Sequence, residues 1–152
     1  RIAIDRVRDA AHGAGVALAA DVAPLSGSVV GDHRRLLQTL DHLLRNAITY
    51  TPPGGRVLVR SKIVEGNAEI VVSDNGQGIP VRQREQIFDR LRRSTIGQAD
   101  EQGPQEASGG FGLPLSRQLV EAHGGTLELL SEVDRGTSVI VRLPLQLAAV
   151  PA

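Results

Sequence analysis

The sequence contains no cysteine, no methionine and no tryptophan, and it has only one tyrosine and two phenylalanines. Without cysteine the chain cannot form a disulfide framework or a thiolate metal site. With so few aromatic side chains, the core has to be built from Leu, Val, Ile and Ala. A platform that stacks nucleic-acid bases is not expected either.

Excess charge and long apolar runs are also missing. The 17 basic and 17 acidic residues balance to a formal net charge of zero, which argues against broad electrostatic binding to nucleic acid or anionic lipid. No apolar run reaches the ~18 residues that a membrane span requires, and there is no signal peptide. The chain begins with Arg1 rather than Met. We therefore expect a cytoplasmic piece of a longer protein whose other parts could include a membrane anchor.

The length of 152 residues suits one domain with one core. Apolar periodicity and turn signals predict helices over 1–14, 32–50, 82–89 and 113–122, and strands over 16–20, 28–30, 56–63, 68–73, 126–130 and 137–143. Because strands and helices do not alternate strictly, we predict an α+β fold, a two-layer α/β sandwich in which about three helices cover one face of a mixed sheet. Domain limits are predicted as a preceding helical linker over 1–14, the domain itself over 15–146 and a tail over 147–152.

The helix predicted over 32–50 carries the first candidate for chemistry. His42, Asn46, Thr49 and Tyr50 follow one another at helical spacing, on a face roughly opposite the leucines. The carboxamide oxygen of Asn46 on a rigid helix would suit Mg²⁺, which prefers oxygen ligands. The alternative interpretation is that Asn46 is merely solvated.

The second candidate is the loop Asp74-Asn75-Gly76-Gln77-Gly78-Ile79-Pro80, which directly follows a predicted strand. Such a loop is often only a turn. In a binding site, the carboxylate of Asp74 could accept a hydrogen bond from an exocyclic amine such as that of adenine. Gly76 and Gly78 would then allow backbone conformations and close approaches that other residues forbid.

The third candidate is the run Gly109-Gly110-Phe111-Gly112-Leu113-Pro114, which leads into a predicted helix. Free N–H groups and the helix dipole at such a start bind phosphate. The alternative is a flexible hinge, because a lone glycine cluster is weak evidence.

Taken in order, the three segments resemble the Bergerat-type ATP site shared by gyrase, Hsp90, MutL and histidine kinases, and they are most similar to the histidine kinases. The segments similar to the kinase N, G1, F and G2 boxes are Arg35–Pro52, Asp74–Pro80, Ile87–Leu91 and Gly110–Leu113, the last followed by Glu121–Gly125 and Gly136-Thr137. The resemblance runs from about Asp32 to Pro144.

The resemblance implies that ATP and Mg²⁺ are the cofactors. Asn46 would hold Mg²⁺, Asp74 would contact the adenine amine, and Tyr50 would line the nucleotide pocket. Arg93 would lie near the γ-phosphate and assist transfer, residues 94–109 would form a lid, and His123 is expected to be structural. The remaining nucleotide contacts implied in this way are those of Gly76, Gly78, Ile79, Phe88, Gly110, Phe111, Gly112 and Leu113.

The implied reaction is transfer of the γ-phosphoryl group to a histidine on a separate dimerisation domain of the same protein, with a response regulator as an indirect partner. The full-length protein would be a homodimer and the present chain a monomer. None of the four histidines has the sequence context of the phosphoacceptor, so this chain alone is not expected to autophosphorylate.

Departures from the family pattern leave a second function open. Thr49 replaces a Lys or His, His42 replaces a frequent Asn, Ser108 replaces a Gly, and Leu91 replaces an aromatic residue. A degenerate pseudokinase that signals through protein contacts is therefore an alternative. A serine kinase of the anti-sigma type is a weaker one. A gyrase- or MutL-like ATPase is disfavoured because the segment 32–50 lacks a glutamate.

Overall fold

Five strands form a mixed sheet in the computed structural model, which describes residues 2–22, 29–78 and 112–145. The strands are β1 Ala17–Val22, β2 Arg56–Val64, β3 Asn67–Asp74, β4 Thr126–Glu132 and β5 Gly136–Pro144. Their order across the sheet is β1-β2-β3-β5-β4. The β1–β2 pair is parallel and the other three pairs are antiparallel.

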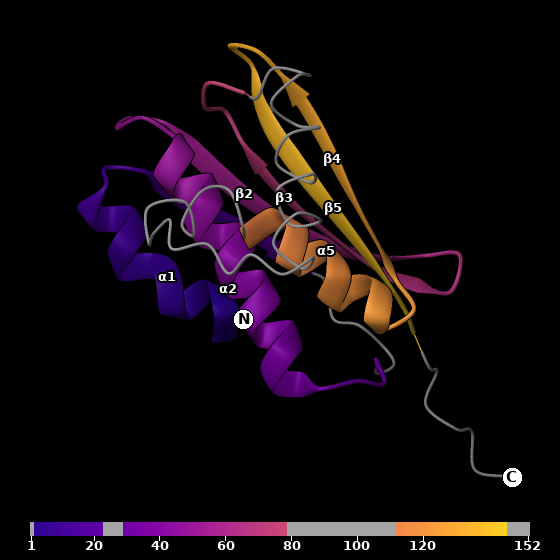
Figure 1. The fold of residues 1–152 in the computed structure, drawn as a ribbon. Coiled ribbons are helices and arrows are strands. Elements are labelled where there is room, and N and C mark those ends of the chain that lie inside the picture. The colour runs from indigo at the N-terminus through magenta and orange to yellow at the C-terminus, as the bar shows by residue number, and fades with distance from the viewer. Residues whose placement is uncertain (1, 23–28, 79–111, 146–152) are drawn as a thin grey trace, which may run out of the picture.

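Three helices lie together on one face of this sheet (Figure 1). They are α1 Ile2–Gly13, α2 His33–Tyr50 and α5 Gly112–Ala122. Alternate strand residues point towards the helices and are buried, among them Val57, Val59, Val72, Leu127, Val139 and Val141. The two-layer α/β sandwich predicted from the sequence is confirmed.

Helix α2 begins and ends where its sequence predicts. The Asp32 side chain accepts hydrogen bonds from the backbone N–H groups of Arg34 and Arg35, which makes it the N-cap. The helix stops before Pro52-Pro53, because proline lacks the N–H that would continue the ladder. Its apolar stripe, Leu43, Leu44, Ala47 and Ile48, is buried in the core.

Helix α1 packs into the same core as α2. Ala3, Ile4, Val7 and Ala11 are all buried and belong to the central apolar cluster. The predicted domain limit after residue 14 stays a prediction, but the described part of α1 contributes to the core rather than standing apart from it. Within the described residues, no helix is both long and apolar enough to cross a lipid bilayer.

The two predicted hairpins are confirmed, with β2 paired to β3 and β4 paired to β5. The predicted strand over 28–30 is wrong for Val29 and Val30, which belong to no strand. Val30 is 64% exposed, so its β-branched side chain has no sheet surface against which to pack. The predicted helix at 82–89, the loop at 94–109 and the tail at 147–152 lie outside the described residues.

A charged network lies on the sheet face opposite the helices. The Glu69 side chain is buried, with its Oε2 atom 3.0 Å from Nε of Arg142 and its Oε1 atom 3.8 Å from Nζ of Lys62. Arg142 also pairs with Glu128 at 3.2 Å. Because a buried carboxylate is stable only when it is paired, this network ties β2, β3, β5 and β4 together.

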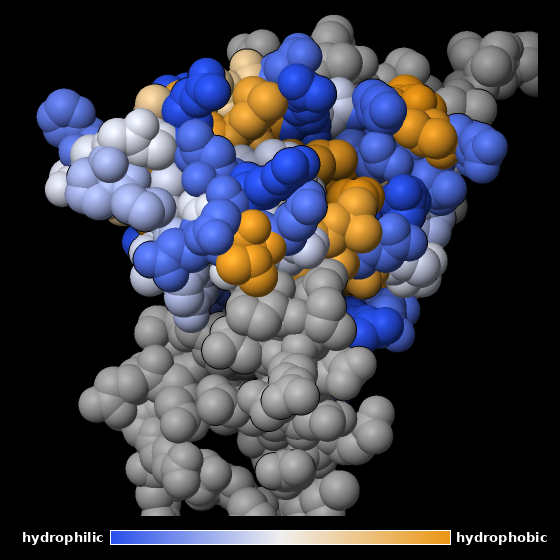
Figure 2. Space-filling view, turned by 90° about the horizontal axis from the view of Figure 1, so that it is seen from above, coloured by the Kyte–Doolittle hydropathy of each residue, from blue (hydrophilic) through white to orange (hydrophobic). Residues whose placement is uncertain are grey.

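Apolar side chains also reach the surface at scattered positions. Figure 2 shows them, on the face seen from above, as separate areas between hydrophilic ones. Exposed large apolar residues include Val30, Ile63, Leu130 and Val133. Scattered exposure of this kind is normal for a protein surface and by itself indicates no binding face.

Candidate functional site

Asp74 ends β3, and two backbone groups hold one of its carboxylate oxygens in place. Its Oδ1 atom accepts hydrogen bonds from the N–H of Gly76 at 2.9 Å and from the N–H of Thr137 at 3.3 Å. Within the described residues, the Oδ2 atom has no hydrogen-bond partner. The carboxylate is therefore fixed in orientation with one oxygen left to accept a donor from a ligand.

Burial raises the pKa of Asp74 above its ordinary value, because desolvation disfavours the charged form. The hydrogen bonds from Gly76 and Thr137 act in the opposite direction and lower the pKa, but the burial effect is the largest. A partly desolvated carboxylate with one free oxygen binds a neutral N–H donor more strongly than a fully hydrated one does.

The loop that follows Asp74 packs directly against the last turn of α2. A Cβ atom added to Gly76 would lie 2.5 Å from the carbonyl oxygen of Tyr50. Only glycine permits this approach, so the loop and the C-terminal end of α2 form one unit. Asn46 lies one turn before Tyr50 on the same helix.

Asn46 is a buried polar residue, at 9% exposure. Its Nδ2 atom has no hydrogen-bond partner among the described residues. The interpretation that Asn46 is merely solvated is therefore wrong. A buried amide donor without a partner costs about 1–3 kcal/mol, and such an orphan donor calls for an explanation such as a ligand that supplies a hydrogen-bond acceptor.

The other polar residues of this helical face are more accessible. His42 is half-buried, Thr49 is exposed, and the Tyr50 side chain is 47% exposed. An exposed aromatic ring at the end of α2, next to the Asp74 loop, is available to contact a flat ligand.

Helix α5 packs beside α2 and begins at Gly112. Gly112 and Leu113 therefore occupy the first turn of a helix, where free N–H groups attract phosphate. The predicted site residues Ile79, Phe88, Arg93, Gly110 and Phe111 lie outside the described residues.

Two backbone contacts that the sequence did not reveal hold the Asp74 loop from the other side. Gly136, at φ +118°, faces the carbonyl oxygen of Asp74 so closely that an added Cβ would collide with it. Gly78, at φ +74°, faces the carbonyl oxygen of Glu132 in the same way. The loop is thus clamped between the end of α2 and the β4–β5 turn.

Asn75 has a structural role within the loop. Its Oδ1 atom accepts a hydrogen bond from the N–H of Arg56 at 2.7 Å, and its own N–H donates to the Arg56 carbonyl at 3.2 Å. This pair fixes the start of β2 against the end of β3. No local signal in the sequence distinguishes this role from that of a turn residue.

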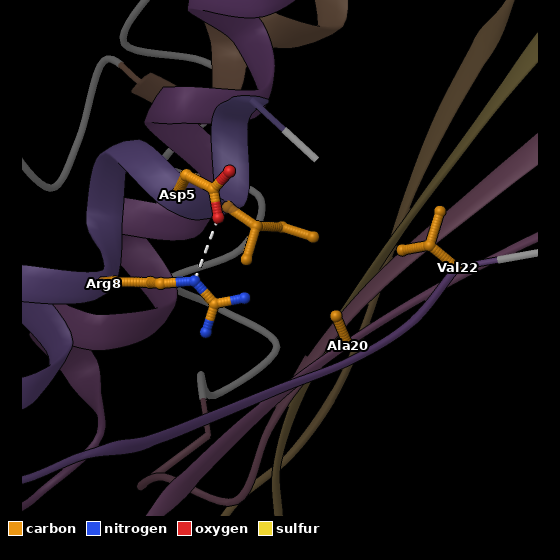
Figure 3. Close-up of a pocket in the computed structure, with 5 residues that line it drawn as sticks. Asp5, Arg8, Ala20 and Val22 are labelled. Atoms are coloured by element: carbon orange, nitrogen blue, oxygen red, sulfur yellow. Dashed lines mark hydrogen bonds and ion pairs between the residues drawn. The ribbon is translucent and has the colours of Figure 1, made fainter.

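Two cavities in the described structure lie elsewhere. A groove of about 380 Å³ between α1 and β1 is lined by Ile4, Asp5, Arg8, Ala20 and Val22, with Asp5 and Arg8 joined as an ion pair (Figure 3). A smaller apolar cavity of about 170 Å³ lies between α1, α2 and the sheet. Neither is lined by a residue of the predicted site.

Among the described residues of the candidate site, Asn46 is the best suited to bind a metal ion. The described residues contain no group of three or more His, Cys, Asp or Glu side chains that could hold an ion. Mg²⁺ commonly needs only one or two protein oxygens when phosphates and water complete its shell. The amide oxygen of Asn46, on the helix that packs beside α5, is a ligand of the type that fits that requirement.

Comparison with known proteins places this chain in a family. The model of the histidine kinase-, DNA gyrase B- and HSP90-like ATPases matches residues 31–147. The chain belongs to this ATPase family, and its relatives include histidine-protein kinases of signal transduction.

Two relatives illustrate the similarity. The sensor protein DivL of Caulobacter vibrioides is 42% identical over 138 residues, which make up 91% of this chain and 16% of DivL. The histidine-protein kinase/phosphatase MprB of Mycobacterium tuberculosis is 37% identical over 137 residues, or 86% of this chain and 26% of MprB. The chain thus corresponds to a minor part of either protein.

Solved structures agree with this assignment. A structure of mycobacterial sensor histidine kinase MprB aligns with a TM-score of 0.75 at 30% identity, and the match covers 97% of this chain and 92% of that one. Full-length ShkA, solved in complex with AMPPNP, aligns with a TM-score of 0.76 at 26% identity over 100% of this chain and 30% of ShkA.

Proposed function

We propose that this domain binds ATP with Mg²⁺ in the cytoplasm and positions the γ-phosphoryl group for transfer to a histidine on a separate dimerisation domain of the same protein. The observation that carries the proposal is the fixed carboxylate of Asp74, which keeps one oxygen free beside the end of α2. Family membership and the AMPPNP bound to ShkA support it. The full-length protein would act as a homodimer and would pass the phosphoryl group on to a response regulator.

Each residue of the candidate site that the structure describes has a role in this proposal. Asp74 accepts the adenine amine and thereby selects the base, Tyr50 contacts the nucleotide, and Asn46 holds Mg²⁺, which neutralises phosphate charge when bound. Backbone N–H groups at Gly112 and Leu113 bind phosphate oxygens. Gly76 and Gly78 keep the loop close to α2 and to the β4–β5 turn. Ile79, Phe88, Gly110 and Phe111 would complete the pocket, and Arg93 would approach the γ-phosphate.

In the proposed step, a neutral imidazole nitrogen of the acceptor histidine attacks the γ-phosphorus as the bond to the bridging oxygen of ADP breaks. ADP leaves, and the imidazole proton passes to a base beside the acceptor, outside this chain. The domain contributes positioning and charge neutralisation, which dominate phosphoryl transfer.

Calorimetry with ADP and Mg²⁺ tests nucleotide binding, and γ-labelled ATP with the separate dimerisation domain tests transfer. We expect binding by this chain alone, and an acid-labile phosphohistidine only on the added domain. Absence of binding at millimolar nucleotide would refute the proposal.

The departures at His42 and Thr49 favour a second candidate, a pseudokinase that signals through protein contacts. Thr49 is exposed on α2 and offers no positive charge to a phosphate. The relative that is 42% identical is named a sensor protein. In this case the labelling experiment would give no phosphohistidine even where nucleotide binds.

The unpartnered amide of Asn46 gives a prediction about stability and function together. Replacing Asn46 by the similarly shaped leucine removes a buried donor that has no partner, so the free energy of unfolding should rise by about 1 kcal/mol. The same change should remove the part of ADP affinity that depends on Mg²⁺. Urea denaturation and calorimetry with and without Mg²⁺ measure the two effects. Asn46→Asp, which keeps an oxygen ligand, is the control and should retain the Mg²⁺ dependence.

The raised pKa of Asp74 gives a prediction about pH. Affinity for ADP should fall as the pH falls and the carboxylate takes up a proton, and this loss should begin at a higher pH than for an ordinary aspartate. Folding should respond with the opposite sign. The folded state binds this proton more tightly than the unfolded state does, so protonation of Asp74 stabilises the fold. This stabilisation is complete below the ordinary aspartate pKa and is lost as the pH rises through the raised pKa of the folded state.

Calorimetric titrations from neutral to acidic pH measure the affinity, with Asp74→Asn as the control that lacks the titrating group. An affinity that stays constant down to the ordinary pKa range of aspartate would contradict the predicted shift.

A further inference from the structure

A single imidazole joins the C-terminal end of α5 to the N-terminal end of α2. The Nδ1 atom of His123 lies 2.7 Å from the carbonyl oxygen of Leu119, and its Nε2 atom lies 3.0 Å from the backbone nitrogen of Asp32. A carbonyl can only accept and an N–H can only donate. The ring must therefore be neutral, with its proton on Nδ1 and an acceptor lone pair on Nε2.

The neighbouring backbone leaves room for this ring only because residue 31 is glycine. A Cβ atom added to Gly31 would collide with the Cδ2 atom of His123. Asp32, which donates its backbone N–H to His123, is also the N-cap of α2. Its side chain accepts hydrogen bonds from N–H groups in the first turn of that helix. His123 therefore contacts the segment that fixes where α2 begins.

The bridge lies at the opposite end of the helix pair from the proposed nucleotide site. Helices α2 and α5 pack side by side (Figure 1). The end of α5 meets the start of α2, so the start of α5 at Gly112 faces the later part of α2, which carries Asn46 and Tyr50. A tie at one end limits how far two packed helices can tilt relative to each other. Loss of the tie therefore changes their spacing at the other end, where nucleotide would be held.

We propose that His123 is a positioning residue for nucleotide binding: its two hydrogen bonds hold α5 against α2 in the arrangement that binds ATP. The inference rests on the proposed function. When the bridge is lost, only a fraction of the molecules have the helix arrangement that binds nucleotide. The apparent affinity is then reduced in proportion to that fraction.

Two substitutions separate the interhelical bond from the bond within α5. In His123→Gln, the amide oxygen can reach the depth of Nε2 and accept from Asp32. In His123→Asn, the shorter amide can replace Nδ1 and donate to Leu119 but cannot reach Asp32. We expect the Asn variant to bind ADP·Mg²⁺ about fivefold more weakly and the Gln variant to bind it within about twofold of the parent chain.

A third variant and a control test whether lost stability explains the change. Gly31→Ala displaces the ring while His123 stays in place, and it should weaken ADP binding as His123→Asn does. Glu69→Ala lowers the melting temperature by breaking the network on the far sheet face, away from α2 and α5, and should leave the affinity unchanged. If the Asn variant loses melting temperature but keeps its affinity, the inference is wrong.

Helix spacing can be measured without nucleotide. Because the chain has no cysteine, spin labels at Gln38→Cys on α2 and Gln118→Cys on α5 are unique, and both positions are exposed. The distance distribution should broaden in the Asn variant and stay narrow in the Gln variant, and an unchanged distribution in the Asn variant overturns the inference. If the parent chain binds no nucleotide, the proposed function fails. If, in that case, the distance distribution of the Asn variant still broadens, His123 only sets the spacing of the two helices. Its role in nucleotide binding would then be refuted.

Discussion

Replacing Asp74 by asparagine is expected to weaken binding of adenine nucleotides by at least on the order of 100-fold, with little change in the fold. The two side chains have nearly the same size, so the packing of the loop against α2 is retained. The loss comes from the chemistry of a single atom, the oxygen that faces the ligand.

The backbone decides which way the new amide points. The N–H groups of Gly76 and Thr137 both donate to Oδ1, so the asparagine must place its oxygen there. Its NH₂ group then occupies the position of Oδ2 and meets the amine of adenine, donor against donor. Each buried donor left without an acceptor costs about 1–3 kcal/mol, and the hydrogen bond to a charged acceptor is lost as well.

The same orientation predicts a change in base preference. Guanine carries a carbonyl oxygen where adenine carries the amine, so the asparagine NH₂ can donate to guanine. Calorimetry with ADP and GDP should show strong preference for ADP in the parent chain and a collapsed preference in Asp74→Asn. Binding of ADP by the variant within about threefold of the parent would contradict the proposed role of Asp74, provided that the melting temperatures agree.

Sequence patterns predicted correctly those helices and strands whose formation depends on neighbouring residues in the chain. Helix α2 has an N-cap, an apolar stripe and a terminating proline pair within its own sequence, and its predicted limits are confirmed. The strand expected over 28–30 failed because a β-branched pair favours a strand only where a partner strand is present. Apolar periodicity predicted the helix over 1–14, but no local signal showed that its apolar face would pack into the core of this domain.

In the candidate site too, only the features that depend on neighbouring residues in the chain were predictable. Asp74 follows a strand and precedes two glycines, which is a local pattern. The bond from Thr137 joins residues 63 positions apart, and the sequence gives no register for such a contact. The burial of Asn46 was missed for a related reason: helical periodicity placed it opposite the leucines, but α2 packs against α1, α5 and β3 rather than against one neighbour.

Gly136→Ala is expected to lower the free energy of unfolding by about 3–4 kcal/mol. Gly136 is buried at the start of β5, its φ of +118° disfavours any side chain, and an added Cβ would collide with the carbonyl oxygen of Asp74. The colliding atom belongs to the backbone and cannot rotate away. The next residue, Thr137, donates to Asp74, so a shift of β5 would also release the carboxylate and weaken ADP binding.

Gly66→Ala separates backbone strain from the collision. Gly66 also has a positive φ, +79°, in the β2–β3 turn, but an added Cβ there has no atom within 4 Å. Strain alone should cost about 1 kcal/mol at this position and should leave ADP affinity unchanged. Urea denaturation of the two variants measures the difference. If Gly136→Ala costs no more than Gly66→Ala, the β4–β5 turn does not clamp the Asp74 loop. The carboxylate would then owe its orientation to Gly76 and the end of α2.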